Sequence, residues 1–348
     1  MSARIVICGA QVPFVRGGAE TLYESLRDEL RRRGHDVEIV TLPFNWRTRT
    51  TTLKSAFAWR LVDLDEVAGA PVDLVIATRF PTYLVRHPNK VIWLIHQYRQ
   101  AYDLLGTPYA DFSDSPDDLR MLEMIRAMDR RALGEAQGLF SISANTAERL
   151  ERHNGLVATP LHPPLKLGDR YRCGSAGDYV FAVGRLDPMK RFDLLVRALA
   201  CTDTPVRAVV AGEGPEYETL RALAAELGVA DRFELPGRID DEELLDRYAG
   251  ALAVFYAPFD EDYGYVTVEA FRSGRPMLTT ADAGGILEFV VDGENGYVTS
   301  SADPSALGER IDRLFRDRAL ARRLGESGRR RVADVTWDRV VEQLTATL

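Results

Sequence analysis

The N-terminal part of the chain contains the pattern that decides the fold class: the apolar runs Ile5-Val6-Ile7-Cys8 and Val37-Glu38-Ile39-Val40-Thr41-Leu42. Between them, apolar residues recur at helical spacing from about Ala19 to Arg33, and Gly34 ends that segment. A strand, a helix and a second strand in this order form a βαβ unit with parallel strands. The pattern therefore predicts an α/β protein.

The same alternation continues along the rest of the chain. Short apolar runs with the composition of strands covered on both faces follow at Leu74 to Ala77, Val91 to Ile95 and Leu139 to Ile142. The pattern lapses in the stretch from Thr159 to Gly177, which is rich in proline and glycine, and restarts at Tyr179 to Val183. It then runs to the strand Ala251 to Tyr256, and the tail after Asp303 is helical throughout. The sequence predicts two doubly wound, Rossmann-like domains.

The length of 348 residues agrees with two domains, since a domain takes roughly 100 to 200 residues. We place an N-terminal domain at residues 1–165, a second domain at 166–335, and at 336–348 a helix that packs back toward the first. Parallel sheets bind ligands beyond the carboxyl ends of their strands. Two such domains facing one another would place a ligand in a shared central cleft.

Composition excludes several classes of protein. Lys and Arg number 44 against 52 Asp and Glu, a net charge of −8, whereas nucleic-acid binding requires excess positive charge. The three cysteines are far apart, so we expect neither a disulfide framework nor a zinc ribbon. No signal-peptide pattern and no 18-residue apolar stretch occurs, and we expect a cytoplasmic protein. Only four of the 44 cations are lysine: Lys54, Lys90, Lys166 and Lys190.

Two stretches combine glycine or cations with the start of a helix. Gly17-Gly18 directly precedes the first helix, where backbone amides and the helix dipole favour an anion, although the pair could equally form only a turn. The spacing is not the GxGxxG of a dinucleotide site. Arg185 and Lys190 follow a strand and precede a helix, where two cations suit a diphosphate. Two solvated surface charges are the alternative.

A stronger signal is the run from Phe259 to Ala270. Glu261 and Glu269 are separated by seven residues and straddle a loop and the next helix, with Gly264 at the bend. Such carboxylates can accept hydrogen bonds from a polyhydroxylated ligand. A second Gly-Gly pair, Gly284-Gly285, again precedes a helix and predicts a second anion cradle.

Together these motifs resemble the retaining glycosyltransferases of family 4, a group that includes glycogen synthase and mannosyltransferase-like enzymes and has the GT-B fold. The resemblance covers nearly the whole chain and includes His96-Gln97 and the segment Ala211-Gly212-Glu213-Gly214-Pro215. It implies transfer of a hexosyl group from a UDP- or GDP-linked sugar to a hydroxyl of a glycan, lipid-linked or small-molecule acceptor. The anomeric configuration would be retained.

The resemblance also implies a role for each matching residue. Arg185 and Lys190 would bind the donor diphosphate, Glu261 the sugar hydroxyls and Glu269 the ribose. The implied catalytic residues are His96, Arg185, Lys190 and Glu261. The implied donor-binding residues are Gly17, Gly18, Gly184, Gly212, Glu213, Gly264, Tyr265, Glu269, Gly284, Gly285 and Ile286. His96 could instead be a core histidine, but the other motifs favour a place at the reacting sugar.

One position departs from the family pattern. The lysine is usually followed by glycine, whereas Arg191 follows it here, so the turn could differ and Arg191 could add a third cation. Two strings resemble metal-binding D-x-D motifs. We discount Asp63-Leu64-Asp65 because it lies in a helical pattern, and Asp260-Glu261-Asp262 because it belongs to the run from Glu261 to Glu269. The expected enzyme needs no metal and no further cofactor.

Several alternatives stay open at this point. The residues Tyr98, Tyr102, Tyr109, Asp111 and Phe112 could stack on an acceptor or form a packed loop. Arg126, Arg130 and Arg131 near Met121, Met124 and Met128 could form a face for peripheral membrane binding, although a solvated helix with a methionine core stripe is favoured. A non-catalytic sugar-nucleotide binder, an epimerase or an inverting transferase are the rival functions. The oligomeric state is not predicted.

Overall fold

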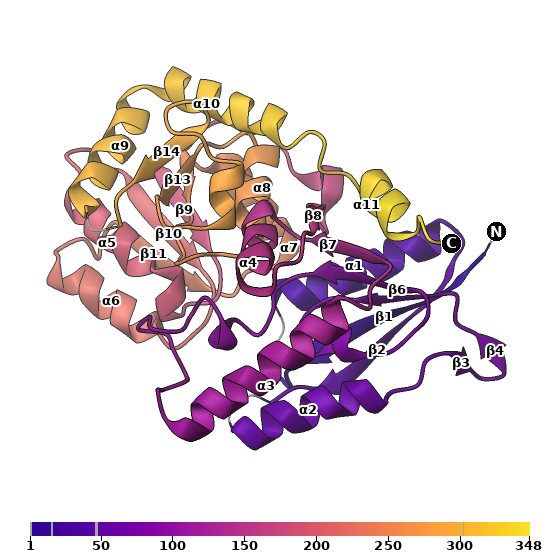
Figure 1. Cartoon of the computed structure of the whole chain (residues 1–348). Coiled ribbons are helices and arrows are strands. Elements are labelled where there is room, and N and C mark those ends of the chain that lie inside the picture. The colour runs from indigo at the N-terminus through magenta and orange to yellow at the C-terminus, as the bar shows by residue number, and fades with distance from the viewer. Residues whose placement is uncertain (1, 15–16, 46–47, 302) are drawn as a thin grey trace. The chain divides into compact units, whose positions relative to one another are not determined.

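The computed structural model describes residues 2–14, 17–45, 48–301 and 303–348. The chain divides into two compact units, one made of Met1–Lys166 with Val335–Leu348 and the other of Leu167–Asp334. Each unit is built on a six-stranded sheet with helices packed against it (Figure 1). All strand pairs in both six-stranded sheets are parallel.

The first unit has the strand order β2-β1-β5-β6-β7-β8. Its strands are β1 (Arg4–Gln11), β2 (Asp36–Pro43), β5 (Leu74–Ala77), β6 (Lys90–Leu94), β7 (Gly138–Ser141) and β8 (Thr159–Pro160), with the small hairpin β3 (Glu66–Val67) and β4 (Ala70–Pro71). Its helices are α1 (Gly18–Arg32), α2 (Arg49–Leu61), α3 (Pro116–Leu133), α4 (Ala144–Asn154) and α11 (Trp337–Leu344). The order reverses between β1 and β5.

The second unit has the strand order β11-β10-β9-β12-β13-β14. Its strands are β9 (Tyr179–Val183), β10 (Arg207–Ala211), β11 (Phe233–Gly237), β12 (Ala253–Phe255), β13 (Met277–Thr280) and β14 (Gly296–Thr299). Its helices are α5 (Phe192–Ala200), α6 (Tyr217–Glu226), α7 (Asp241–Gly250), α8 (Tyr265–Arg272), α9 (Pro304–Arg316) and α10 (Arg318–Arg331). This is the classic doubly wound order, and it reverses between β9 and β12, where such sheets bind ligands.

Helical spacing explains how α1 packs on its sheet. Leu22, Leu26 and Leu30 are four residues apart, lie on one face of the helix and are at most 2% exposed. Helix α5 of the second unit packs in the same way, with Leu195, Val196 and Leu199 buried in the core. Each unit thus has its own hydrophobic core, which fixes the loops at the ends of its strands.

Most strand predictions are confirmed, and three local predictions are wrong. The tail after Asp303 is three helices with breaks at Asp317 and at residues 332–336. Helix α2 ends at Leu61, so Asp63-Leu64-Asp65 lies outside any helix. The pair Gly284-Gly285 begins only a single 3-10 turn, Gly285–Glu288. A Gly-Gly pair can precede either an α-helix or a short 3-10 turn, so the sequence alone does not distinguish the two.

Helix α11 packs within the first unit. Trp337 meets Trp93 edge to face with ring centroids 6.4 Å apart, and Asp338 forms an ion pair with Arg33. Among the described helices, none combines the length and apolar character that a membrane crossing requires.

Candidate functional site

The loops that follow β9 and β12 meet beside the point where the strand order of the second unit reverses. Lys190 lies in a 3-10 turn, Pro188–Lys190, between β9 and α5. Its Nζ donates to Glu261 Oε2 at 2.5 Å and to the Tyr256 hydroxyl at 2.9 Å. The Tyr256 hydroxyl is 3.1 Å from the same Glu261 oxygen. The structure therefore joins two sequence-predicted residues, Lys190 and Glu261, and adds Tyr256, which sequence reasoning missed.

Electrostatics keep Lys190 protonated. Burial by itself would lower the pKa of Lys190, but Glu261 and Tyr256 together raise it above its ordinary value. Burial and the adjacent Glu261 carboxylate raise the pKa of Tyr256, so that side chain stays a neutral hydroxyl. Lys190 and Glu261 are each about 21% exposed at the side chain. The cluster is therefore a partly buried ion pair bridged by a phenol.

Arg185 differs from Lys190 in its surroundings. Arg185 is exposed, and within the described part of the chain its guanidinium forms no salt bridge. The two cations predicted together thus have different environments, since one is paired in the cluster and the other faces solvent. Arg185 retains its five donors for a ligand.

Gly184, Gly212 and Glu213 hold two neighbouring loops together. A Cβ on Gly212 would lie 1.9 Å from the Gly184 carbonyl oxygen, and Gly212 has a φ of +142° that disfavours other residues. The Glu213 carbonyl accepts a hydrogen bond from Leu186 at 2.9 Å, while its residue is exposed. These residues therefore bring the loop after β10 against the loop that carries Arg185.

Glu269, on α8, is held by two tyrosines. Tyr171 donates to its Oε1 at 3.0 Å and Tyr248 to its Oε2 at 2.6 Å. Burial raises the pKa of Glu269, and the two hydroxyls oppose that rise. Tyr265, one turn before it, packs edge to face on Tyr263. A ligand hydroxyl at Glu269 would have to share a carboxylate that already accepts two hydrogen bonds.

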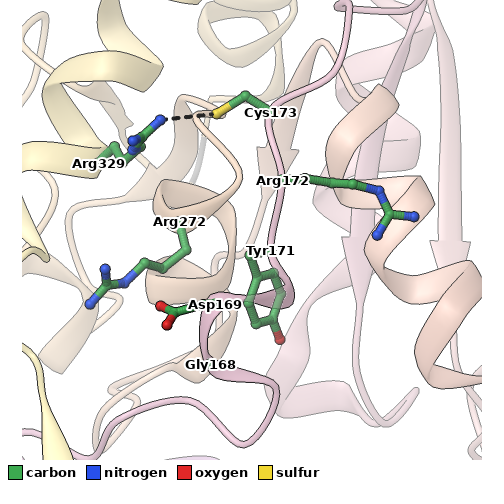
Figure 2. A pocket seen from close by; sticks show the side chains of 7 residues that line it. All are labelled: Gly168, Asp169, Tyr171, Arg172, Cys173, Arg272 and Arg329. Atoms are coloured by element: carbon green, nitrogen blue, oxygen red, sulfur yellow. Dashed lines mark hydrogen bonds between the residues drawn. The ribbon is translucent and has the colours of Figure 1, made fainter.

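A pocket of about 300 Å³ lies beside Tyr171 (Figure 2). It is formed by the chain segment before β9, by Arg272 on α8 and by Arg329 on α10. Figure 2 shows Arg329 directed toward Cys173, at 3.7 Å from the sulfur, and Arg172 turned away from the other two arginines. The residues that line this pocket are not among the site residues predicted from the sequence. Tyr171 lines this pocket, and its hydroxyl binds Glu269.

The Gly284-Gly285 loop packs on the loop that carries Glu261. A Cβ on Gly284 would lie 2.6 Å from the Glu261 carbonyl oxygen, and Gly284 has a φ of +70°. Gly285 donates its amide to that same carbonyl at 2.8 Å. Ile286 is fully buried and sits against Gly264, which caps α8 with a φ of +80°. At Gly285 the predicted anion cradle is wrong, because its N–H is already used by backbone.

The first unit places Gly17 and Gly18 at the start of α1. Gly17 donates its amide to Glu20 Oε2 at 2.8 Å, so the chain's own carboxylate occupies this position. Glu20 is buried and also contacts Arg79 at 3.2 Å and the Tyr23 hydroxyl at 3.0 Å. The Gly17 amide is therefore already used within the chain, whereas the assignment of Gly18 to a phosphate stays a prediction.

His96 and the loop after it show how the first unit is organised beyond β6. His96 is half-buried, with Nδ1 2.6 Å from the Gln97 carbonyl, so it is not a fully buried core histidine. Tyr98 packs among Phe44, Phe80 and Phe112. The Tyr102 hydroxyl donates to buried Asp129 at 2.8 Å. For Tyr98 and Tyr102 the packed-loop alternative is the one observed.

The methionines of α3 have mixed environments. Met121 is buried, Met128 packs against the core and Met124 is 44% exposed. Arg126 donates to the Ala101 carbonyl at 2.9 Å. The predicted core stripe is therefore confirmed at two of the three methionines.

With this geometry established, comparison with known proteins identifies one part of the chain. Residues 174–331 match the family described as Glycosyl transferases group 1. This group 1 segment lies entirely in the second unit and contains Arg185, Lys190, Glu261 and Glu269.

Curated relatives match over part of their length. The chain is 30% identical to D-inositol 3-phosphate glycosyltransferase of Streptomyces avermitilis over 243 residues, which are 60% of this chain and 52% of that protein. The protein of the same name from Frankia alni is 35% identical over 175 residues, 46% of this chain and 42% of the relative. The chain thus spans about half the length of the curated relatives it matches.

Solved structures match over the whole chain. Sucrose-phosphate synthase from Thermosynechococcus elongatus has a TM-score of 0.78 at 20% identity, covering 99% of this chain and 98% of that one. HepE from Anabaena, in complex with UDP and glucose, has a TM-score of 0.71 at 19% identity and covers 99% of both chains. The chain has the GT-B fold, with two Rossmann-like units, as the sequence predicted.

Two groups of tyrosines were missed by sequence reasoning, and one arginine was left undecided. Tyr256 was counted only as the end of an apolar strand, and Tyr171 and Tyr248 carried no motif. The sequence left open whether Arg191 adds a third cation, and its guanidinium binds Asp282 in the structure. The signal that could have revealed this was the arginine itself, which stands where a glycine is usual.

Proposed function

We propose that this protein is a retaining glycosyltransferase that moves a hexosyl group from a nucleoside diphosphate sugar to an acceptor hydroxyl. The observation that carries the proposal is the cluster of Lys190, Glu261 and Tyr256 at the reversal point of the second sheet. That cluster lies inside the group 1 segment. A cation and a carboxylate in contact suit a ligand that combines a diphosphate with sugar hydroxyls.

The proposed chemistry uses the donors of Lys190 and Arg185. As the bond from the anomeric carbon to the diphosphate breaks, the sugar approaches an oxocarbenium ion and negative charge grows on the leaving phosphate. Lys190 has three N–H donors, and Glu261 and Tyr256 accept two of them. We assign the third donor and the exposed Arg185 guanidinium to the phosphate oxygens.

Glu261 and Glu269 would bind hydroxyls in this scheme. A carboxylate offers about four acceptor positions, so Glu261 can accept from Lys190, from Tyr256 and also from the donor sugar. Glu269 would accept from the ribose while keeping its bonds to Tyr171 and Tyr248. His96 is proposed to contact the transferred sugar. The neutralisation of the diphosphate by cations leaves no step that needs a metal, and full activity in chelator is the expected outcome.

Uridine diphosphate sugars are the first donors to test, because HepE was crystallised with UDP. D-inositol 3-phosphate is the first acceptor to test, because the curated relatives carry that substrate in their name. Both assignments rest on similarity and are part of the proposal.

The test is a thermal-shift panel of UDP, GDP, ADP and TDP, followed by product analysis. A ligand at 100 times its Kd adds about 2.7 kcal/mol to the free energy of unfolding, which gives a measurable rise in Tm. NMR of the product formed from an α-linked donor should show an α-linked product. A β-linked product would contradict retention, and the absence of any Tm shift would favour a protein that does not use these nucleotides.

A further inference from the structure

Arg191 has an unusual backbone conformation beside the cluster. It separates Lys190 from α5 and has φ 51° and ψ 42°, in the left-handed region that favours glycine. An arginine here bears a conformational cost that a glycine would avoid. The structure around it shows what the side chain supplies in return.

The guanidinium of Arg191 binds two other loops. Nε donates to the Ala257 carbonyl at 2.7 Å and Nη2 to the Pro258 carbonyl at 2.9 Å. Nη1 and Nη2 each bind one oxygen of Asp282 at 2.8 Å. Nη2 also lies 2.9 Å from Thr280 Oγ1. The side chain is only 13% exposed, and all three of its nitrogens are used within the protein.

Asp282 is adapted to this partner. Ser301 donates to its Oδ2 at 3.0 Å. Burial alone would raise the pKa of Asp282, but hydrogen bonds from Arg191 and Thr280 bring it down to about 2. The bidentate pair is therefore charged on both sides at neutral pH, the arrangement in which a planar guanidinium binds most strongly.

Backbone bonds connect the same loops close to Glu261. Phe259 donates to the Met189 carbonyl at 2.9 Å, which joins the turn of Lys190 to the loop after β12. Asp260 donates to the Asp282 carbonyl at 2.9 Å, and Glu261 donates to the Ala283 carbonyl at 3.1 Å. Lys190 and Glu261 thus lie on two loops that the Arg191 side chain connects to one another.

We propose that Arg191 is a positioning residue that, with Asp282, holds the turn of Lys190 against the loop of Glu261 so that their side chains meet. This proposal deepens the proposed function and rests on it for its consequence in catalysis. It differs from a role as a third phosphate-binding cation, because that role would need guanidinium donors that Arg191 has already committed.

Four variants test the proposal. Arg191→Gly removes the guanidinium and relieves the left-handed conformation, so loss of function would not come from backbone strain. Arg191→Lys keeps the charge but loses the planar fork, and Asp282→Asn keeps the shape but loses the carboxylate. Arg232→Ala is the matched control. Its guanidinium also binds carbonyls, those of Leu199, Thr204 and Val206, and lies outside the three loops.

The first readout needs no activity. Because the chain has only four lysines, NMR of lysine labelled at Cε and Nζ gives few signals, and a Lys190→Arg variant assigns the one from Lys190. In Arg191→Gly and Asp282→Asn we expect the Nζ signal of Lys190 to move toward that of the exposed Lys54, because the contact with Glu261 is loosened, with no change in Arg232→Ala. An unchanged Lys190 signal in both variants would overturn the proposal.

The second readout is kinetic, with saturating acceptor. We expect Arg191→Gly, Arg191→Lys and Asp282→Asn each to lower kcat/KM for the donor by about tenfold to a hundredfold, the cost of misplacing a reacting group by about 1 Å. The Arg191→Gly/Asp282→Asn double variant should fall no further than either single variant. Near-normal kinetics in Asp282→Asn and Arg191→Lys, with loss only in Arg191→Gly, would show a third cation instead.

The two readouts separate the proposals. A wild-type protein that transfers no sugar from any donor would refute the proposed function, while the NMR signal of Lys190 would still decide whether Arg191 positions Lys190. If the wild-type enzyme transfers sugar and all three site variants keep normal activity, the role of Arg191 in catalysis is refuted and the proposed function still stands.

Discussion

Replacement of Lys190 by alanine is the perturbation with the largest expected effect on turnover. The change removes an ammonium that contacts Glu261 at 2.5 Å and Tyr256 at 2.9 Å, and with it the proposed contact to the leaving phosphate. Loss of one preorganised contact of this kind costs about 10² to 10³ in kcat, or roughly 3 to 4 kcal/mol. Because Lys190 is about a fifth exposed, water can partly replace it beside Glu261, and the protein should remain folded.

The assay measures nucleoside diphosphate release at saturating donor and acceptor. Lys54→Ala is the matched control, since Lys54 is an exposed lysine on α2 in the other unit. We expect a loss of about 10² or more for Lys190→Ala and a similar loss for Arg185→Ala, with unchanged turnover for the control. Near-normal kcat in both site variants, in protein shown to be folded by its near-UV circular dichroism, would refute the assignment of these cations to the leaving group.

Three further predictions concern stability. Burial raises the pKa of Asp129 to about 7, so the folded state binds its proton more tightly than the unfolded state; this favours folding below about pH 4, and that contribution, at most about 4 kcal/mol, is lost as the pH rises through about 7. Asp129→Asn should therefore lose less Tm than the wild type between pH 5 and pH 8, and parallel Tm curves would contradict this. Gly212→Ala places a Cβ 1.9 Å from the Gly184 carbonyl, and its free energy of unfolding by urea should fall by more than about 2 kcal/mol; a loss below about 0.5 kcal/mol would show that the loops can separate freely. Lys90 is fully buried and donates to the carbonyls of Tyr83, Val85 and Ala132. Lys90→Met should therefore lower the free energy of unfolding by about 3 kcal/mol, measured by urea denaturation, and an unchanged urea midpoint would show that these hydrogen bonds do not stabilise the fold.

The sequence was sufficient for the architecture because local patterns carry it. The strand Tyr179–Val183 coincides with its predicted range, and the helix predicted after Lys190 is observed from Phe192. Buried parallel strands are continuous apolar runs, and amphipathic helices repeat at a fixed spacing, so both can be seen without knowledge of the rest of the chain.

The contacts of the site could be predicted only in part. Lys190 and Glu261 were both identified, but they are 71 residues apart, and only the strand order, which places β12 beside β9, brings them together. The pairing of Arg191 with Asp282 spans 91 residues and has no local signal. Of the Gly284-Gly285 pair, assigned to an anion cradle, the Gly285 amide binds the Glu261 carbonyl, and that pairing has no local signal in the sequence.

The central claim is that the loop between β9 and α5, which carries Arg185 and Lys190, binds a nucleoside diphosphate. Isothermal titration of UDP and GDP into the wild type and into an Arg185→Ala/Lys190→Ala double variant tests it most directly. The account predicts one-to-one binding of at least one of the two nucleotides by the wild type, weakened by about a hundredfold or more in the double variant, since two charged hydrogen-bonding groups are lost. Equal affinity of the wild type and the double variant, or no binding by the wild type, would contradict it.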